Sequence, residues 1–295
     1  MKNKLIKELE DESISIIRDS YSHSENPIFL YSIGKDSNVL LNLIKKSFYP
    51  AKIPFPLMHI DTKWKFKEMI NFRNRIAKKF NIDLIVYTNE QAKKLHPQLD
   101  KNYTHVAKTQ ALKKAIDLNN FDFIYAGARR DEESSRSKER VVSLRKNNHY
   151  WDPKDQRPEI WKLFNYKKEK GETFRIFPLS NWTELDIWEY IKIEKIEIPS
   201  LYYAKKREVI NHKNQLIMVD DNRLIISKKE KPLLKKVRFR TLGCYPLSAA
   251  VESSADTIEK IIKEIKILKM SERQGRLIDH DDAYSMEKKK IQGYF

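Results

Sequence analysis

Short apolar runs alternate with amphipathic segments along the first two thirds of the chain. Five runs have the length and continuous apolar character of strands that are buried on both faces: 27–32, 56–61, 82–87, 121–126 and 173–178. Before and between them, apolar residues recur with helical spacing over 5–19, 37–47, 64–80 and 105–118. This alternation predicts an α/β fold with a mainly parallel, five-stranded sheet and flanking helices.

Two later segments depart from this alternation. Residues 145–172 are polar, aromatic and rich in turn residues, which predicts a long insertion over the sheet edge. Thr183 and Asp186 then predict a capping box that opens a further helix.

The pattern changes again after about residue 200. The segments 215–219 and 224–226 predict a hairpin around a polar turn, and 256–268 predicts a last amphipathic helix. We therefore expect an α/β domain over 1–200 and a C-terminal extension over 201–295.

The loop Ser32-Ile33-Gly34-Lys35-Asp36-Ser37 joins the first strand to the first helix after it. At such a junction the free backbone N–H groups and the positive end of the helix dipole meet at one point. Gly34 allows close approach of an anion, Lys35 adds charge, and Ser32 and Ser37 add hydroxyl donors. The loop therefore predicts a phosphate-binding site. The alternative is an ordinary strand–helix turn with Asp36 or Ser37 as N-cap.

Two common phosphate-loop patterns do not fit. The kinase-type P-loop requires a glycine five positions before the Gly-Lys pair, where this chain has Phe29. The dinucleotide fingerprint requires three closely spaced glycines, and no other glycine lies within that spacing of Gly34. The remaining pattern, Ser-x-Gly-x-Asp-Ser after a first strand, resembles the PP-loop of the ATP pyrophosphatases, which cleave between the α- and β-phosphates of ATP.

Polar residues also follow two other predicted strands, at the sheet edge where ligands bind in such folds. Gly127, Arg129 and Arg130 follow the fourth strand, and paired guanidinium groups suit phosphate or sulfate oxygens. The alternative is a salt-bridged helix start, with nearby carboxylates pairing the arginines. Asp61 ends the second strand, where it could accept from ribose hydroxyls or the adenine amine, or hold a metal. His59 beside it is expected to be a buried, hydrogen-bonded histidine.

A third cluster lies near the C-terminus. Arg238 and Arg240 could close over an anion, and they precede the lone cysteine, Cys244. That thiol could be a redox nucleophile, but without an adjacent histidine a small buried residue is the favoured interpretation.

Composition excludes several classes of protein. The net charge of +17 could indicate a nucleic-acid partner, but the lysines are spread over every segment and form no basic stripe with interleaved aromatics. No apolar run approaches the roughly 20 residues of a membrane helix, and the charged first ten residues do not resemble a signal peptide. No spaced set of His, Asp and Glu predicts a metal site made by the protein alone. We expect a cytoplasmic location and neither a nucleic-acid nor a membrane partner.

Taken together, these segments closely resemble the small, catalytic subunits of ATP sulfurylase (sulfate adenylyltransferase) of bacterial sulfate assimilation. The matching stretches are 30–37, 54–66, 127–140, 151–161, 177–188, 220–223, 238–246, 271–276 and 292–295. The resemblance implies that ATP, bound with Mg²⁺, reacts with sulfate to give adenylyl sulfate and diphosphate. Sulfate is already an anion, so we expect no general base.

The resemblance also implies roles for the site residues. The β- and γ-phosphates would be held by Ser32, Gly34, Lys35, Asp36 and Ser37. Sulfate and the α-phosphate would be held by Arg129 and Arg130, with Arg238 and Arg240 as further candidates, and Asp61 and Gly127 would complete the nucleotide site. The catalytic groups are expected to be Lys35, Asp36, Arg129 and Arg130.

The family further implies a GTPase large subunit as partner, in a heterodimer that serves cysteine biosynthesis. No GTPase motif occurs in this sequence, so that partner would be a separate chain. The first helix, the insertion 145–172 and the tail after residue 271 are candidates for the contact. Two alternatives stay open: a phosphoadenylyl-sulfate reductase of the same fold, which requires Cys244 as nucleophile, and a PP-loop tRNA-modifying enzyme, which the charge would suit.

Overall fold

The computed structural model describes residues 2–212, 214–228, 230–267, 291 and 293. Its larger sheet has the order β3-β2-β1-β4-β6-β5. The strands are β1 (Pro27–Leu30), β2 (Leu57–Ile60), β3 (Leu84–Tyr87), β4 (Phe123–Tyr125), β5 (Val142–Arg145) and β6 (Thr173–Ile176). All neighbours pair in parallel except β5 and β6. The predicted α/β fold with a mainly parallel sheet is confirmed, and each of the five expected strands is present.

The sixth strand, β5, was not predicted. It is antiparallel to β6 at the sheet edge, and two of its four residues are polar, so no apolar run marks it. The insertion 145–172 covers this edge, as expected. The side chain of Gln156 accepts the backbone N–H of Leu144 at 2.9 Å, and that of Glu159 accepts the N–H of Val142 at 2.9 Å. These bonds occupy an edge that could otherwise pair with another chain.

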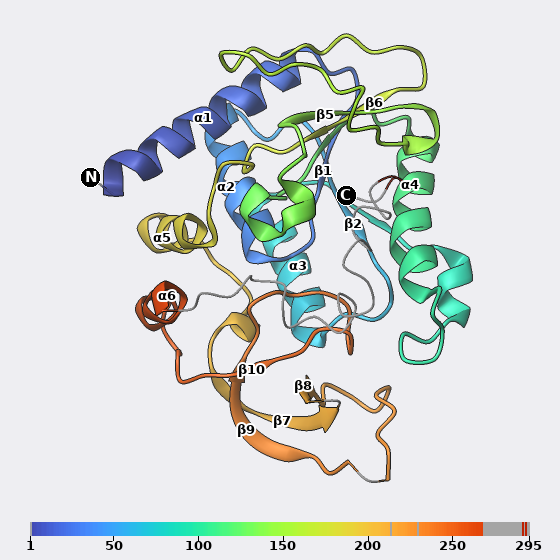
Figure 1. Ribbon diagram of the computed structural model, residues 1–295, viewed down its shortest axis with the longest axis vertical. Helices are drawn as coiled ribbons and strands as arrows, with labels where there is room; N and C mark the ends of the chain where they lie inside the picture. Colours follow the sequence, from blue (N-terminus) through green and yellow to red (C-terminus); the bar gives the residue numbers. More distant parts are fainter. Residues whose placement is uncertain (1, 213, 229, 268–290, 292, 294–295) are drawn as a thin grey trace.

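Six α-helices flank the sheets of the described residues. They are α1 (Lys2–Ser22), α2 (Lys35–Phe48), α3 (Lys67–Phe80), α4 (Ala111–Asn119), α5 (Glu184–Glu194) and α6 (Ile258–Ile267). A π-helix, η2 (His105–Gln110), leads into α4. The short helical turns are η1 (Glu90–Lys94), η3 (Arg130–Glu132), η4 (Ser134–Arg136), η5 (Asn147–His149) and η6 (Ser200–Tyr202). In Figure 1, α4 lies on one side of the larger sheet and α1, α2 and α5 lie on the other.

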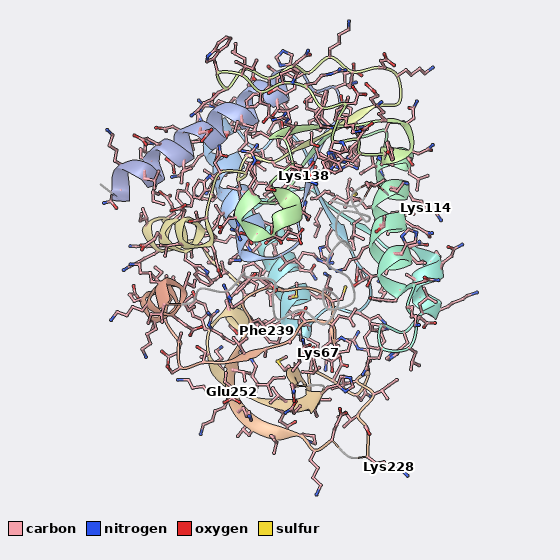
Figure 2. The ribbon with its side chains drawn as sticks, viewed as in Figure 1. Lys67, Lys114, Lys138, Lys228, Phe239 and Glu252 are labelled. Atoms are coloured by element: carbon pink, nitrogen blue, oxygen red, sulfur yellow. The ribbon has the colours of Figure 1, made fainter. Side chains whose placement is uncertain are left out.

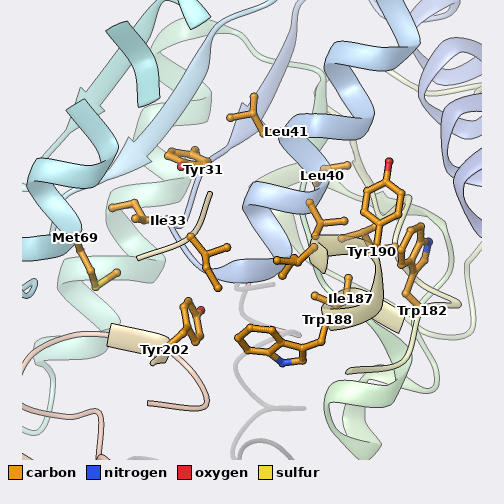
Figure 3. Packing of buried hydrophobic residues seen from close by; sticks show 14 of the residues in the cluster. Tyr31, Ile33, Leu40, Leu41, Met69, Trp182, Ile187, Trp188, Tyr190 and Tyr202 are labelled. Atoms are coloured by element: carbon orange, nitrogen blue, oxygen red, sulfur yellow. The ribbon is translucent and has the colours of Figure 1, made fainter. Parts of the chain in front are cut away.

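Alternate residues of the central strands face opposite sides of the sheet. Phe29 and Tyr31 belong to the main core, which includes α1, α2, α3 and α5, whereas Ile28 and Leu30 pack against α4. Figure 3 shows part of the main core, with Leu40 of α2 among its labelled side chains. Because both faces are covered, the strands have continuous apolar sequences rather than alternating ones.

The C-terminal extension contains a second, antiparallel sheet, drawn at the bottom of Figure 1. Its strands are β7 (Lys205–His212), β8 (Gln215–Met218), β9 (Leu233–Arg238) and β10 (Val251–Glu252). The expected hairpin between 215–219 and 224–226 is wrong, because β8 pairs with β7 through a turn at Asn214, whose φ is 62°. The backbone of Ile225 is held instead by the side chain of Gln98, which accepts its N–H at 2.9 Å.

The division at residue 200 stays a prediction, because one hydrophobic cluster joins the two sides. Ile187 and Ile191 of α5 lie in the same core as Val209 of β7 and Ile261 of α6. The predicted match at 271–276 lies outside the described residues.

The positive charge is distributed widely over the described surface. Figure 2 labels Lys67, Lys114, Lys138 and Lys228, which are all exposed and belong to four separate parts of the fold. This distribution agrees with the prediction of solvated lysines rather than a single basic stripe. Within the described ranges, no helix is long and apolar enough to cross a membrane.

Candidate active site

The predicted phosphate loop lies between β1 and α2, and its backbone is held by the first turn of that helix. Asn38 donates from Nδ2 to the carbonyls of Ile33 and Gly34 at 3.1 and 2.9 Å, and the Ser37 hydroxyl donates to Gly34 at 2.8 Å. Ile33 has a φ of 72°, an unusual conformation for a β-branched residue. The first turn of α2 therefore fixes the loop in a conformation that the chain would rarely adopt alone.

A chain of charges connects this loop to the end of β4. Nζ of Lys35 lies 3.2 Å from Asp36 Oδ2, and Nε of Arg129 donates to Asp36 Oδ1 at 2.6 Å. Lys35 and Arg129 are almost fully buried, and Asp36 is partly exposed. Asp36 thus compensates two buried cations, and its own oxygens are oriented by them.

Beside the loop, the carboxyl ends of β1, β2 and β4 form a cavity of about 220 Å³. One wall is apolar and contains Leu30, Met58, Ile60, Leu112 and Ala126. Another part of the lining is the loop itself, with Ser32, Gly34, Lys35, Asp36 and Ser37. A cavity with one apolar wall and one wall of phosphate-binding character fits a nucleotide.

Gly127 brings the end of β4 against the start of α2. A Cβ on Gly127 would lie 3.2 Å from the carbonyl carbon of Asp36 and 3.3 Å from the nitrogen of Ser37. Glycine is therefore required here by the close approach of two backbones, a role that differs from the predicted contact with the nucleotide.

The C-terminal extension supplies the outer part of the cavity. Tyr202 of η6 and residues 241–243 line it, and the Tyr202 hydroxyl accepts the backbone N–H of Lys35 at 2.8 Å. Three more basic side chains, Lys65, Lys108 and Arg136, also line the cavity. Sequence reasoning assigned no role at the site to Lys65, Lys108 or Tyr202, since single lysines and tyrosines in a chain rich in both carry no local signal.

None of the four predicted anion-binding arginines lines this cavity: Arg129 donates to Asp36, as described above, and the other three contact other polar groups. Arg130 donates to Asn181 Oδ1 at 2.7 Å and lies 3.5 Å from Glu159. Arg238 is buried and donates to Glu264 Oε1 at 2.6 Å. The third, Arg240, donates to Glu184 Oε2 at 2.7 Å. Carboxylates lie beside both adjacent arginines, as the alternative interpretation expected: Glu159 beside Arg130, and Asp36 and Asp131 beside Arg129.

Asp61 lies in a neighbouring surface hollow rather than in the cavity wall. Burial would raise the pKa of its carboxyl group, but the backbone N–H of Lys63, 2.8 Å away, and the Lys63 charge hold that pKa below its usual value. Next to it, His59 is buried, and its Nδ1 lies 2.8 Å from the Tyr31 carbonyl, as predicted. Burial lowers the pKa of His59 to about 3, so the ring is neutral at pH 7.

Cys244 is buried next to the cavity, with its Sγ 3.3 Å from Thr62 Oγ1. Burial alone would raise the thiol pKa, but the charges of Lys108 and Lys65 lower it to about 7. The favoured prediction of a buried cysteine is confirmed, although its charged surroundings were not foreseen.

The comparisons with known proteins agree with this geometry. Residues 26–250 match the family model for the phosphoadenosine phosphosulfate reductase domain. Sulfate adenylyltransferase subunit 2 from Acinetobacter baumannii is 57% identical over 98% of this chain and 97% of that protein. The same subunit from Psychromonas ingrahamii is 55% identical over 100% of this chain and 99% of that protein.

A solved structure shows the same fold at low sequence identity. The FMN adenylyltransferase of Candida glabrata in complex with ATP superposes with a TM-score of 0.53, at 16% identity, over 94% of this chain and 89% of that one. On the strength of the full-length relatives, the chain belongs to the sulfate adenylyltransferase subunit 2 family, within the phosphoadenosine phosphosulfate reductase domain group.

Proposed function

We propose that the chain is the catalytic subunit of a sulfate adenylyltransferase, which converts ATP and sulfate into adenylyl sulfate and diphosphate. The observation that carries the proposal is the cavity that apolar residues and the loop 32–37 at the start of α2 line together. A sulfate oxygen attacks the α-phosphorus, and the bond to the β-phosphate oxygen breaks as diphosphate leaves with the bonding electron pair. Such a transfer depends mainly on positioning and charge stabilisation.

The geometry supports distinct roles for the loop residues. The N-terminus of α2, the Ser32 hydroxyl and the Lys35 ammonium would hold the β- and γ-phosphates, which form the leaving group. The Ser37 hydroxyl would join them by releasing its hydrogen bond to the Gly34 carbonyl. The adenine ring would lie against the apolar wall. Arg129 acts through Asp36 in this proposal and positions it, because its guanidinium donates to that carboxylate.

The site residues also fit a magnesium ion carried on the ATP phosphates. Asp36 and Glu132 bring two carboxylates to the cavity wall, and Mg²⁺ bound to a nucleotide usually takes one or two from the protein. The ion would neutralise charge on the departing diphosphate.

The proposal includes a partner, since the relatives are named as a second subunit. Adenylyl sulfate contains a high-energy anhydride, so a GTPase partner that couples GTP hydrolysis to its synthesis would make the reaction favourable. We place this complex in the cytoplasm and in sulfate assimilation. The names of the relatives lend no support to a tRNA-modifying activity.

The test is sulfate-dependent release of diphosphate from ATP by the purified chain together with its partner and GTP. Lys35→Met should lower the rate by about 100- to 1,000-fold, the typical effect of removing one charge-stabilising donor. Lys45→Met, an exposed change on the same helix, should leave it unchanged. Equal release with and without sulfate in the unmodified protein would refute the proposed function.

The reductase alternative has a separate test, motivated by the thiol beside the cavity. Cys244→Ser should retain sulfate-dependent turnover, because the proposed transfer uses no thiol. The reductase alternative predicts instead a thiol-dependent reduction of phosphoadenylyl sulfate by the unmodified chain, which Cys244→Ser would abolish.

A further inference from the structure

Arg136 lies at the end of η4 and lines the nucleotide cavity, although the proposed function assigns it no role. The residue is only 5% exposed. Its Nε donates to Glu133 Oε1 at 3.1 Å, while its Nη1 is buried and has no hydrogen-bond partner. A buried donor without an acceptor is unfavourable. A ligand that supplies the acceptor would remove this penalty and would therefore bind more tightly.

The other arginines of the predicted site have their guanidinium groups directed elsewhere. Arg129 donates to Asp36, Arg238 to Glu264 and Arg240 to Glu184, and none of the three lines the cavity. Among the described residues, Arg136 is therefore the arginine that combines a place in the cavity lining with a buried N–H group that has no acceptor.

The charge of the surrounding cavity wall indicates which kind of hydrogen-bond acceptor Arg136 would bind. Lys35, Lys65 and Lys108 line the same cavity, and the carboxylates beside them are Asp36 and Glu132. This excess of positive charge favours an anionic oxygen over a neutral carbonyl. A tetrahedral oxyanion also suits the planar fork of a guanidinium group, which can donate two N–H groups to two oxygens.

We propose that Arg136 binds an oxygen of the reacting oxyanion, either sulfate or the α-phosphate of ATP, and so takes the role that the sequence suggested for Arg129, Arg130, Arg238 and Arg240. The inference rests on the proposed function, because it names a contact within the same site. It explains how the segment after β4 could contribute to binding of the oxyanion although Arg130 itself lies outside the cavity.

The experiment compares Arg136→Lys and Arg136→Ala with Arg140→Ala, an exposed arginine of the same segment. The complex with its partner is assayed for KM of sulfate and kcat, the isolated subunits for the Kd of ATP, and all of them for the melting temperature. If Arg136 holds sulfate, the KM of sulfate rises about ten- to a hundredfold, as expected for a charged hydrogen bond, while the Kd of ATP stays constant. If it holds the α-phosphate, the Kd of ATP rises or kcat falls by a similar factor while the KM of sulfate stays constant.

Both of these outcomes support an oxyanion contact, and Arg136→Lys should recover part of the effect of Arg136→Ala because it retains the charge. A lower melting temperature with unchanged KM, kcat and Kd would show a purely structural arginine and overturn the inference. Should Arg136→Ala fail to fold, Arg136→Lys alone decides between these results. Failure of the unmodified complex to turn over sulfate would instead refute the proposed function.

Discussion

Asp36 connects the phosphate loop to the end of β4 and has a second role besides any contact with the nucleotide. Its carboxylate pairs with both Lys35 and Arg129, which are almost fully buried. Removing Asp36 would take one carboxylate away from both cations, although Arg129 also lies 3.4 Å from Asp131, and breaking a buried ion pair typically costs about 3–5 kcal/mol. Substitutions at Asp36 therefore change stability and catalysis together. Lys35→Met tests catalysis more directly, because the partly exposed Asp36 carboxylate still pairs with Arg129 in that variant.

Gly127→Ala is expected to destabilise the protein and reduce its activity. The new Cβ would lie 3.2–3.3 Å from the backbone of residues 36 and 37, so the end of β4 must move away from α2. Overpacking of this kind typically costs about 1–3 kcal/mol, which a urea titration would measure.

Gly34→Ala is the matched control for stability. Its Cβ would meet only ordinary contacts, at 3.4 Å from Tyr202 Oη and 3.5 Å from Ser32 Oγ, and its φ of −66° suits any residue. We expect the free energy of unfolding to change by less than about 1 kcal/mol here. Equal destabilisation by both substitutions would contradict the close packing of β4 on α2.

At the residue scale, sequence reasoning located the loop and missed much of the remaining wall. Ser32 to Ser37 were found because they are adjacent in sequence and lie at a strand–helix junction. Lys65, Lys108 and Tyr202 come from three distant segments, and only the packing of the extension and η2 onto the sheet brings them together. The roles of Arg129 and Arg130 stay predictions, because adjacent residues at a strand end point in different directions: Arg129 turns towards α2 and Arg130 towards Asn181.

At the element scale, α5 depends on its capping box. Thr183 Oγ1 accepts the N–H of Asp186 at 3.1 Å, and the Asp186 carboxylate accepts the N–H of Thr183 at 2.9 Å. Thr183→Ala should lower the free energy of unfolding by about 1 kcal/mol, measured from the midpoint of urea unfolding. Thr257→Ala, just before α6, provides a comparison. Thr257 Oγ1 accepts the N–H of Lys260 at the longer distance of 3.4 Å, so this substitution should lower the free energy of unfolding by less.

Apolar patterns longer than about ten residues predicted the helices well, since each of these helices buries a continuous stripe of apolar side chains: α1, α2, α3 and α5. The two predictions that failed concern short segments, the strand β5 and the turn before β8. β5 has four residues with an alternating pattern, and its register is set by pairing with β6, which lies 28 residues further along the chain. The turn before β8 depends on one left-handed asparagine, Asn214, which no neighbouring glycine or proline marks.

At the scale of the whole molecule, Glu10 joins three helices. Its carboxylate lies 2.6 Å from Nζ of Lys46 in α2 and accepts the hydroxyl of Tyr190 in α5 at 2.5 Å. Burial would raise the pKa of Glu10 above its ordinary value of 4.5, but the hydrogen bonds from Lys46, Tyr190 and Lys7 lower it to about 2. The ionised form is therefore favoured in the folded state.

This pKa shift predicts the direction of a pH dependence. Because the folded pKa is depressed, Glu10 stabilises the fold fully above about pH 4.5, and this contribution is lost as the pH falls towards about 2. Urea titrations between pH 6 and 3 should show a smaller loss of stability for Glu10→Gln than for the unmodified protein. If the free energy of unfolding falls equally with pH in the two proteins, the depressed pKa of Glu10 would be contradicted.

The partner subunit should contact the insertion 145–172 at the turn formed by residues 160–163. Within this turn Ile160, Trp161 and Leu163 are 54%, 87% and 70% exposed, and the N–H of Leu163 donates to the Ile160 carbonyl at 3.0 Å. Exposed tryptophans surrounded by apolar residues are typical of binding hot spots. Lys162 lies 3.5 Å from Glu12 of α1, so two of the three segments predicted to contact the partner form one face.

Trp161→Ser and Leu163→Ser should each weaken binding of the partner subunit by about tenfold or more, measured by titration calorimetry. The control is Leu99→Ser, since Leu99 is also 70% exposed but lies between η1 and η2. None of these side chains lines the nucleotide cavity, so ATP binding by the isolated chain should not change. If all three variants bind the partner as the unmodified chain does, the contact must lie on another face. If Leu99→Ser weakens binding as much as Leu163→Ser, the effect reflects a general loss of apolar surface rather than a specific contact at the turn.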